Sequence, residues 1–179
     1  MTYKKHLKKI LSTSLIVLGI LSLSEIMMWK KTNDYQFPKK QILKTEKRTL
    51  FVFHTEIAKT MEYKLTVSDN DSITKYSYQN LNNKEKNMEF YYHKASEQLT
   101  LVFDKFILSD KMEYQNKKIH KLNFGYYKLK KSYDDGSGPL LFNTEYGILG
   151  IGNSYGPEFV YLTNSDLKLA KEIIDELYK

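Results

Sequence analysis

The chain has 179 residues, of which 41% are hydrophobic and 27% are charged, so it fits one globular domain and is not intrinsically disordered. It contains no cysteine, which excludes disulfides, thiolate zinc sites, a cysteine nucleophile and a lipidated cysteine anchor. The net charge is +7, but residues 1–29 contribute +3 of it, so the pI overstates any affinity for nucleic acid.

The N-terminal segment has the pattern of an export or membrane-anchoring sequence. Residues 1–9 form a basic region, and residues 10–29 are largely apolar and precede two further lysines. Twenty such residues can cross about 30 Å of hydrocarbon as a helix. The residues expected to mark this membrane segment are Ile10, Leu15, Val17, Leu18, Ile20, Leu21, Met28 and Trp29.

Two interpretations of this segment remain open. In one, residues 10–29 are an uncleaved transmembrane anchor with Trp29 at the level of the headgroups. In the other, they hold the apolar core of a signal peptide that is cut before Glu25. We expect the N-terminus inside and the domain outside the cytoplasm, either anchored in the cell membrane or secreted or periplasmic after cleavage. This orientation depends on the short, signal-like leading tail, because lysines flank the segment on both sides.

Residues 30–46 are polar and contain Pro38, so they are predicted to be a linker. From residue 47 the hydrophobic period becomes two, which is typical of strands with one buried face. Residues 61–68 alternate without exception, whereas the apolar run at residues 50–53 predicts a strand covered on both faces. The other predicted strands span residues 73–78, 88–93, 99–103, 119–129, 140–142, 146–151 and 159–162.

The last element is predicted to be an amphipathic helix. Asn164 or Ser165 caps it, and Asp166 lies in its first turn. Its apolar stripe consists of Leu167, Ala170, Ile173, Ile174, Leu177 and Tyr178. The sequence therefore predicts an α+β, mainly β domain over residues 47–179: an antiparallel meander sheet, curved or sandwich-like, with this helix packed on one face.

Several short patterns resemble catalytic or cofactor-binding motifs, but none has the neighbouring elements or the spacing that its motif requires. Residues 152–156 match the G-x-S-x-G pattern, but a strand-like segment follows where a nucleophile elbow needs a helix, and no histidine comes later. The glycines at 150, 152 and 156 miss the spacing of a dinucleotide fingerprint. The loop at 134–138 lacks the alternating acids of a calcium loop, and the histidines form no short-spaced pair. We therefore predict no cofactor, no metal site and no enzyme activity.

Charge is unevenly distributed along the domain. Residues 111–131 hold seven lysines against one glutamate, whereas residues 132–179 hold eight acids against three lysines. These segments either neutralise each other or leave a basic patch that faces an anionic envelope polymer or lipid headgroups. The candidate patch consists of Lys117, Lys118, Lys121, Lys128, Lys130 and Lys131. Nucleic acid is not expected as a partner, because the domain is predicted to be exported and carries a large acidic segment.

A late segment, Phe142-Asn143-Thr144-Glu145-Tyr146-Gly147-Ile148-Leu149, carries a resemblance. Together with the basic, apolar leader and the tyrosine- and lysine-rich β domain, it resembles small exported proteins of Bacteroidota-type bacteria. The similarity covers about the C-terminal third of the chain. It implies a bacterial cell envelope and brings no activity and no functional residues.

Three hypotheses about function follow. The first is a non-catalytic envelope protein, membrane-anchored or secreted, that binds a protein, polymer or lipid partner or supports structure. The second is a carrier that encloses a lipid or small hydrophobic ligand in a cavity of at least about 300 Å³. The third is an enzyme whose ionisable groups converge from separate strands. The first is favoured, and the sequence leaves the ligand and the oligomeric state open.

Overall fold

The computed structural model describes residues 41–54, 57–110, 113–119, 121–133 and 136–179. The basic region and the predicted membrane segment at 10–29 lie outside these ranges, so the anchor stays a prediction. Within the ranges given, no helix is both long and apolar enough to cross a bilayer.

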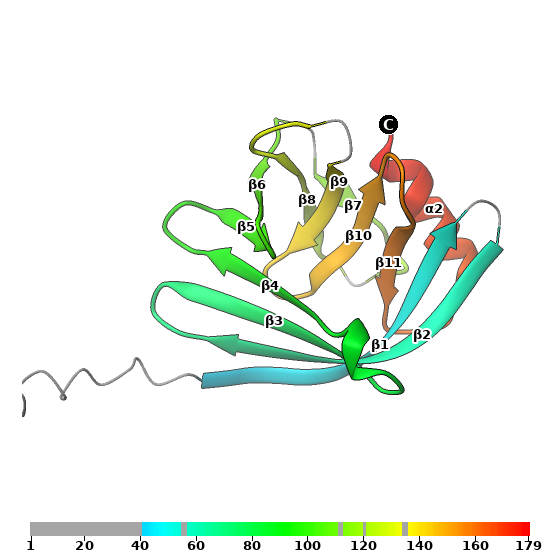
Figure 1. Cartoon of the computed structure of the whole chain (residues 1–179), viewed down its shortest axis with the longest axis horizontal. Coiled ribbons are helices and arrows are strands. Elements are labelled where there is room, and N and C mark those ends of the chain that lie inside the picture. Colours follow the sequence, from blue (N-terminus) through cyan, green and yellow to red (C-terminus); the bar gives the residue numbers. More distant parts are fainter. Residues whose placement is uncertain (1–40, 55–56, 111–112, 120, 134–135) are drawn as a thin grey trace, which may run out of the picture. The chain divides into compact units, whose positions relative to one another are not determined.

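The described residues form eleven strands, one 3₁₀ turn and one α-helix (Figure 1). The elements are β1 (Gln41–His54), β2 (Ile57–Asp69), β3 (Ile73–Asn80), η1 (Lys84–Lys86), β4 (Met88–His93), β5 (Gln98–Leu101), β6 (Asp104–Leu108), β7 (Tyr114–Gln115), β8 (Asn123–Leu129), β9 (Ser137–Asn143), β10 (Gly147–Asn153), β11 (Glu158–Leu162) and α2 (Leu167–Leu177). The first strand begins at Gln41, so the last residues of the predicted linker belong to the sheet.

Ten of these strands close into an antiparallel barrel. Their order is β6-β5-β4-β3-β2-β1-β11-β10-β9-β8, and β8 pairs back onto β6 with Phe106 opposite Leu129. The short strand β7 pairs with β8. The mainly β class, the antiparallel meander and the C-terminal helix are thus confirmed. The sheet is a closed ring rather than an open or sandwich-like one, because two long-range pairings, β1–β11 and β6–β8, join its edges.

Tyrosine side chains fill much of the barrel interior. The rings of Tyr63 and Tyr161 meet edge to face with centroids 6.0 Å apart. The hydroxyl of Tyr76 donates to the carbonyl of Thr144 at 2.7 Å, and that of Tyr78 accepts from the backbone N–H of Ile148 at 2.9 Å. The rings of Tyr76 and Tyr78 therefore contribute apolar packing while their hydroxyls form hydrogen bonds with backbone groups at residues 144 and 148.

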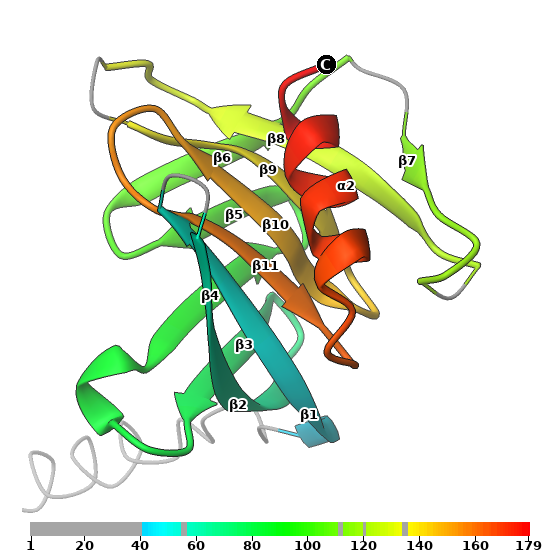
Figure 2. The ribbon, with the colours of Figure 1, turned by 90° about the vertical axis from the view of Figure 1, so that its right-hand side faces the viewer.

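A second core lies outside the barrel wall, beneath α2. The helix covers β9, β10 and β11 (Figure 2). In β1, Leu50 belongs to the interior core and Phe51 to the core beneath the helix, so the prediction that this strand is covered on both faces is confirmed. Gly150 permits the close approach, since a Cβ atom there would lie 3.1 Å from Cγ2 of Ile173.

The helix begins later than its sequence pattern indicates. Asp166 is the N-cap, and its carboxylate accepts from the backbone N–H of Leu169 at 2.9 Å, so the predicted caps at Asn164 and Ser165 were wrong. The helix buries Leu169, Ala170, Ile173 and Leu177, whereas Leu167 and Tyr178 of the predicted stripe are exposed.

Candidate functional site

The predicted basic patch divides into two groups at opposite ends of β8. Lys117, Lys118 and Lys121 lie in the connection from β7 to β8, and we call them the turn group. Lys128, Lys130 and Lys131 lie at the other end of the strand, and we call them the end group. All six side chains are exposed. Because β8 has seven residues, the groups are separated by about 20 Å and do not form one continuous patch.

The turn group borders an open cavity of about 520 Å³. Its lining residues are Gln115, Asn116, Lys117, Lys121 and Leu122. The two ammonium groups are hydrogen-bond donors that suit a phosphate or carboxylate group. The carboxamide nitrogen of Gln115 already donates to the side-chain oxygen of Asn123. Lys118 does not line this cavity, and its Nζ lies 3.2 Å from Oε1 of Glu172 on the helix. This ion pair ties one lysine of the turn group to the acidic C-terminal segment.

The turn itself is firmly held. The side-chain oxygen of Asn116 accepts from the backbone N–H of Lys118 at 2.9 Å, and its amide nitrogen donates to the hydroxyl of Tyr114 at 2.9 Å. The buried side chain of Ile119 packs into the core beneath α2. These contacts hold the backbone at residues 116–119, which carries Lys117.

The end group has a different setting. Lys128 borders a cavity of about 420 Å³ together with Ser109, Asp110, Tyr126, Tyr127 and Pro139. The backbone N–H of Lys130 donates to the carbonyl of Lys105 at 2.8 Å, so the chain after β8 stays beside β6. This brings Lys105, which was not part of the predicted patch, next to Lys130.

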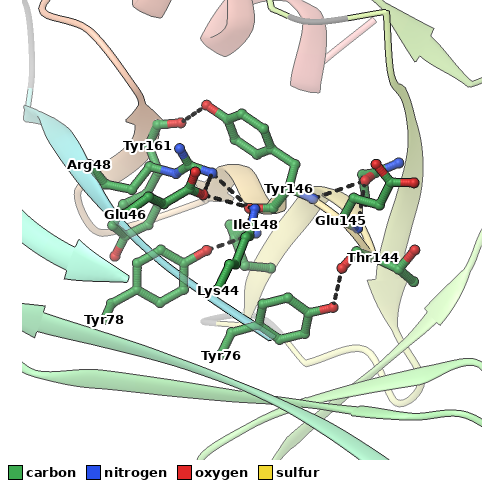
Figure 3. Close-up of polar contacts among 11 residues, drawn as sticks. Lys44, Glu46, Arg48, Tyr76, Tyr78, Thr144, Glu145, Tyr146, Ile148 and Tyr161 are labelled. Carbon is green, nitrogen blue, oxygen red and sulfur yellow. Dashed lines mark hydrogen bonds and ion pairs between the residues drawn. The ribbon is translucent and has the colours of Figure 1, made fainter. Parts of the chain in front are cut away.

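A buried ion pair inside the barrel was not predicted. The side chain of Arg48 is only 1% exposed, and its guanidinium forms an ion pair with the carboxylate of Glu46 (Figure 3). Oε1 of the same carboxylate lies 2.9 Å from Nζ of Lys44. Nη2 of Arg48 donates to the carbonyl of Tyr146 at 3.0 Å, and the guanidinium lies 4.0 Å from the centre of the Tyr146 ring. Nε and Nη1 have no hydrogen-bond partner among the described residues. The signal was present in the sequence, because positions 44, 46 and 48 share a strand face with the interior residue Leu50.

Beside this pair, a third open cavity of about 530 Å³ lies at the end of the barrel. It is lined by Leu43, Lys44, Val67, Asp69, Thr74, Lys94, Thr144 and Glu145. Burial raises the pKa of Asp69, but the hydrogen bonds from Lys94 and Thr74 outweigh it and hold the pKa below its ordinary value. Nζ of Lys94 lies 2.7 Å from this carboxylate. Two lysines and two acids balance the charge here, so the cavity favours neither an anion nor a cation.

The residues screened for catalysis do not converge. His54 ends β1 and His93 ends β4, and in the strand order these positions are at opposite ends of the barrel. Residues 152–156 span the end of β10 and the turn to β11, so a strand and not a helix follows the serine. His120 and the acids at 134–135 lie outside the described residues. Among the described residues, no group of three or more histidine, aspartate or glutamate side chains is placed to hold a metal ion.

Buried tyrosines carry the largest changes in pKa. Burial raises the pKa of Tyr146 to about 12, although the nearby charge of Arg48 lowers it, and burial raises the pKa of Tyr127 to about 12. Burial also raises the pKa of Tyr161 well above its ordinary value. These hydroxyls stay protonated at neutral pH, and that of Tyr146 donates to the carbonyl of Tyr161 at 3.0 Å.

Comparison with known proteins gives no relative: no protein-family model, no curated protein and no solved structure matches this chain.

Proposed function

We propose that this protein is a non-catalytic cell-envelope protein, membrane-anchored or secreted, whose barrel binds an anionic envelope polymer through the turn group. The supporting observation is the cavity of about 520 Å³ that Lys117 and Lys121 border. Exposed lysine ammonium groups suit the repeated phosphate or carboxylate groups of such a polymer. The envelope setting rests on the basic, apolar leader and on the resemblance of residues 142–149.

The fixed backbone of the turn supports this role. Asn116 holds the turn through two hydrogen bonds, and Ile119 anchors it in the core. A ligand site that is already ordered loses little conformational entropy on binding. Lys117 and Lys121 keep their long side chains exposed, so they are accessible to a large polymer.

The carrier hypothesis has less support. The interior residues that would have to line a ligand cavity pack against one another instead, as in the edge-to-face contact of Tyr76 and Phe142 with centroids 5.3 Å apart. The enzyme hypothesis lacks the required convergence of ionisable groups, since His54 and His93 lie at opposite ends of the barrel.

Binding to model polyanions tests the proposed site. The full chain is titrated with polyphosphate and with polygalacturonate, as a phosphate and a carboxylate polymer. We expect K117E/K121E to weaken binding by about tenfold, because reversing two exposed charges removes attraction and adds repulsion. The control K59E/K64E makes the same charge change at two exposed lysines of β2. Equal weakening by both variants, or no binding by the natural chain, would reject the site.

Location is tested by cell fractionation with intact-mass measurement of the tagged chain. We expect either the full-length mass in the membrane fraction or a chain trimmed near Glu25 outside the cytoplasm. A full-length chain dissolved in the cytosol contradicts the envelope assignment.

A further inference from the structure

The turn between β5 and β6 exposes two adjacent apolar side chains. Val102 is 73% exposed and Phe103 is 92% exposed. Neither contributes to the core, whereas the strands on both sides are firmly anchored by Leu99 and Phe106, which are fully buried. The turn is therefore a rigid support for an apolar tip in solvent.

The backbone of this turn is also unfavourable for its sequence. Val102 has φ of +54°, in the left-handed region that glycine and asparagine adopt readily and a β-branched residue rarely does. Glycine would relieve the strain and remove an exposed apolar side chain. The fold gains nothing from valine here, so the residue points to a contact outside the barrel.

Lysines surround the base of the tip. Lys105 follows it on β6, and the hydrogen bond from Lys130 N–H to the Lys105 carbonyl brings Lys130 and Lys131 alongside. All three side chains are exposed. Asp104 also lies at the base, and its carboxylate accepts from the hydroxyl of Tyr133. Among the described residues, three lysines around one acid give the base a positive charge.

The size and charge of this feature fit a lipid surface better than a protein partner. Two side chains offer about 300 Å² of contact, well below the roughly 800 Å² that each side of a stable protein interface buries. An apolar tip with lysines at its base matches the layering of an anionic bilayer, with hydrocarbon beneath negatively charged headgroups.

We propose that Val102 and Phe103 insert into the surface of an anionic bilayer while Lys105, Lys130 and Lys131 contact its headgroups. The ligand chemistry is an anionic phospholipid surface, and the contact sets how the barrel lies on the membrane. It is independent of polymer binding by the turn group, which lies at the other end of β8.

Tryptophan fluorescence of the full chain tests this insertion. Trp29 is the only tryptophan, so the double variant W29F/F103W reports on the tip alone. The chain is incorporated into vesicles of phosphatidylcholine or of an equimolar mixture with phosphatidylglycerol, each with nitroxide-labelled acyl chains. We expect quenching and a blue shift in the anionic vesicles only. W29F/Y155W is the matched control, because Tyr155 lies in another turn and is 79% exposed.

Two further variants in the W29F/F103W background separate insertion from folding. K130E/K131E is expected to lower the equilibrium constant for insertion, obtained from the fraction of quenched tryptophan, by about fivefold or more for each lysine. Val102→Gly is expected to raise the denaturant midpoint yet weaken quenching, two changes of opposite sign that a purely structural role would not produce. K117E/K121E should leave the quenching unchanged.

The proposal is wrong if the tryptophan of W29F/F103W keeps a water-like emission in anionic vesicles, or if the tryptophan of W29F/Y155W is quenched equally. It is also wrong if the emission of W29F/F103W shifts when the protein self-associates without lipid, because the tip would then be a protein contact.

Discussion

Arg48 combines features that rarely occur together at one residue. Its guanidinium is almost fully buried, pairs with one carboxylate and lies over the ring of Tyr146, yet two of its nitrogens have no hydrogen-bond partner among the described residues. A buried charge with unused donors depends strongly on its single counter-charge. Glu46 therefore matters for stability although it lies near the start of the sheet.

Replacing Glu46 by glutamine tests this dependence. We expect a loss of about 2 kcal/mol in the free energy of unfolding, below the roughly 3–5 kcal/mol of a fully buried pair, because the Glu46 side chain is 31% exposed. Urea denaturation at neutral pH measures it. Glu145→Gln is the control, since this exposed residue lies near the same end of the barrel (Figure 3) and should change stability by less than about 0.5 kcal/mol. Equal effects of the two variants would show that Arg48 does not need its partner.

Among the elements, most strands could be predicted from the sequence, because alternation is a local property. The predicted strand at 61–68 lies within β2, and the one at 159–162 lies within β11. Phe103 shows the limit of this rule. It continues the alternation of Leu99 and Leu101, yet it lies in a turn and is exposed. Periodicity cannot reveal where a hairpin reverses when no glycine or asparagine marks the turn.

The candidate site shows the same division between local and long-range information. The lysines at 117–131 are evident in the sequence, but their separation into two groups follows from the straight strand between them. Lys105 joins the end group only through the pairing of β6 with β8, which no local pattern encodes. The burial of Arg48 likewise depends on long-range contacts, because its guanidinium donates to the carbonyl of Tyr146, 98 residues later in the chain.

At the scale of the whole molecule, the tyrosine-filled interior predicts an alkaline limit to stability. The pKa of the buried Tyr127 and Tyr146 is raised to about 12, in each case mainly by burial, whereas an unfolded tyrosine titrates near about 10. Above about pH 10 the unfolded chain therefore loses protons that the folded chain retains, so stability falls as the pH rises towards about 12. Below about pH 10 these groups add no pH dependence.

The measurement is the denaturant midpoint at increasing pH, together with the ultraviolet absorbance of tyrosinate. We expect absorbance from the buried rings to appear together with the loss of circular dichroism. Tyr155→Phe, at an exposed position, should leave the transition unchanged. If all fifteen tyrosines ionise near their ordinary pKa while the barrel stays folded, the prediction is contradicted.

The pairing of β1 with β11 has a consequence for how the chain is made. Thr49 lies opposite Leu162, so the free edge of the first strand is covered only after the last strand has been synthesised. A nascent chain that ends before β11 exposes two bare strand edges, on β1 and β10, each able to recruit another polypeptide. The barrel is thus a late product of synthesis, because the ring cannot close before β11 has left the ribosome.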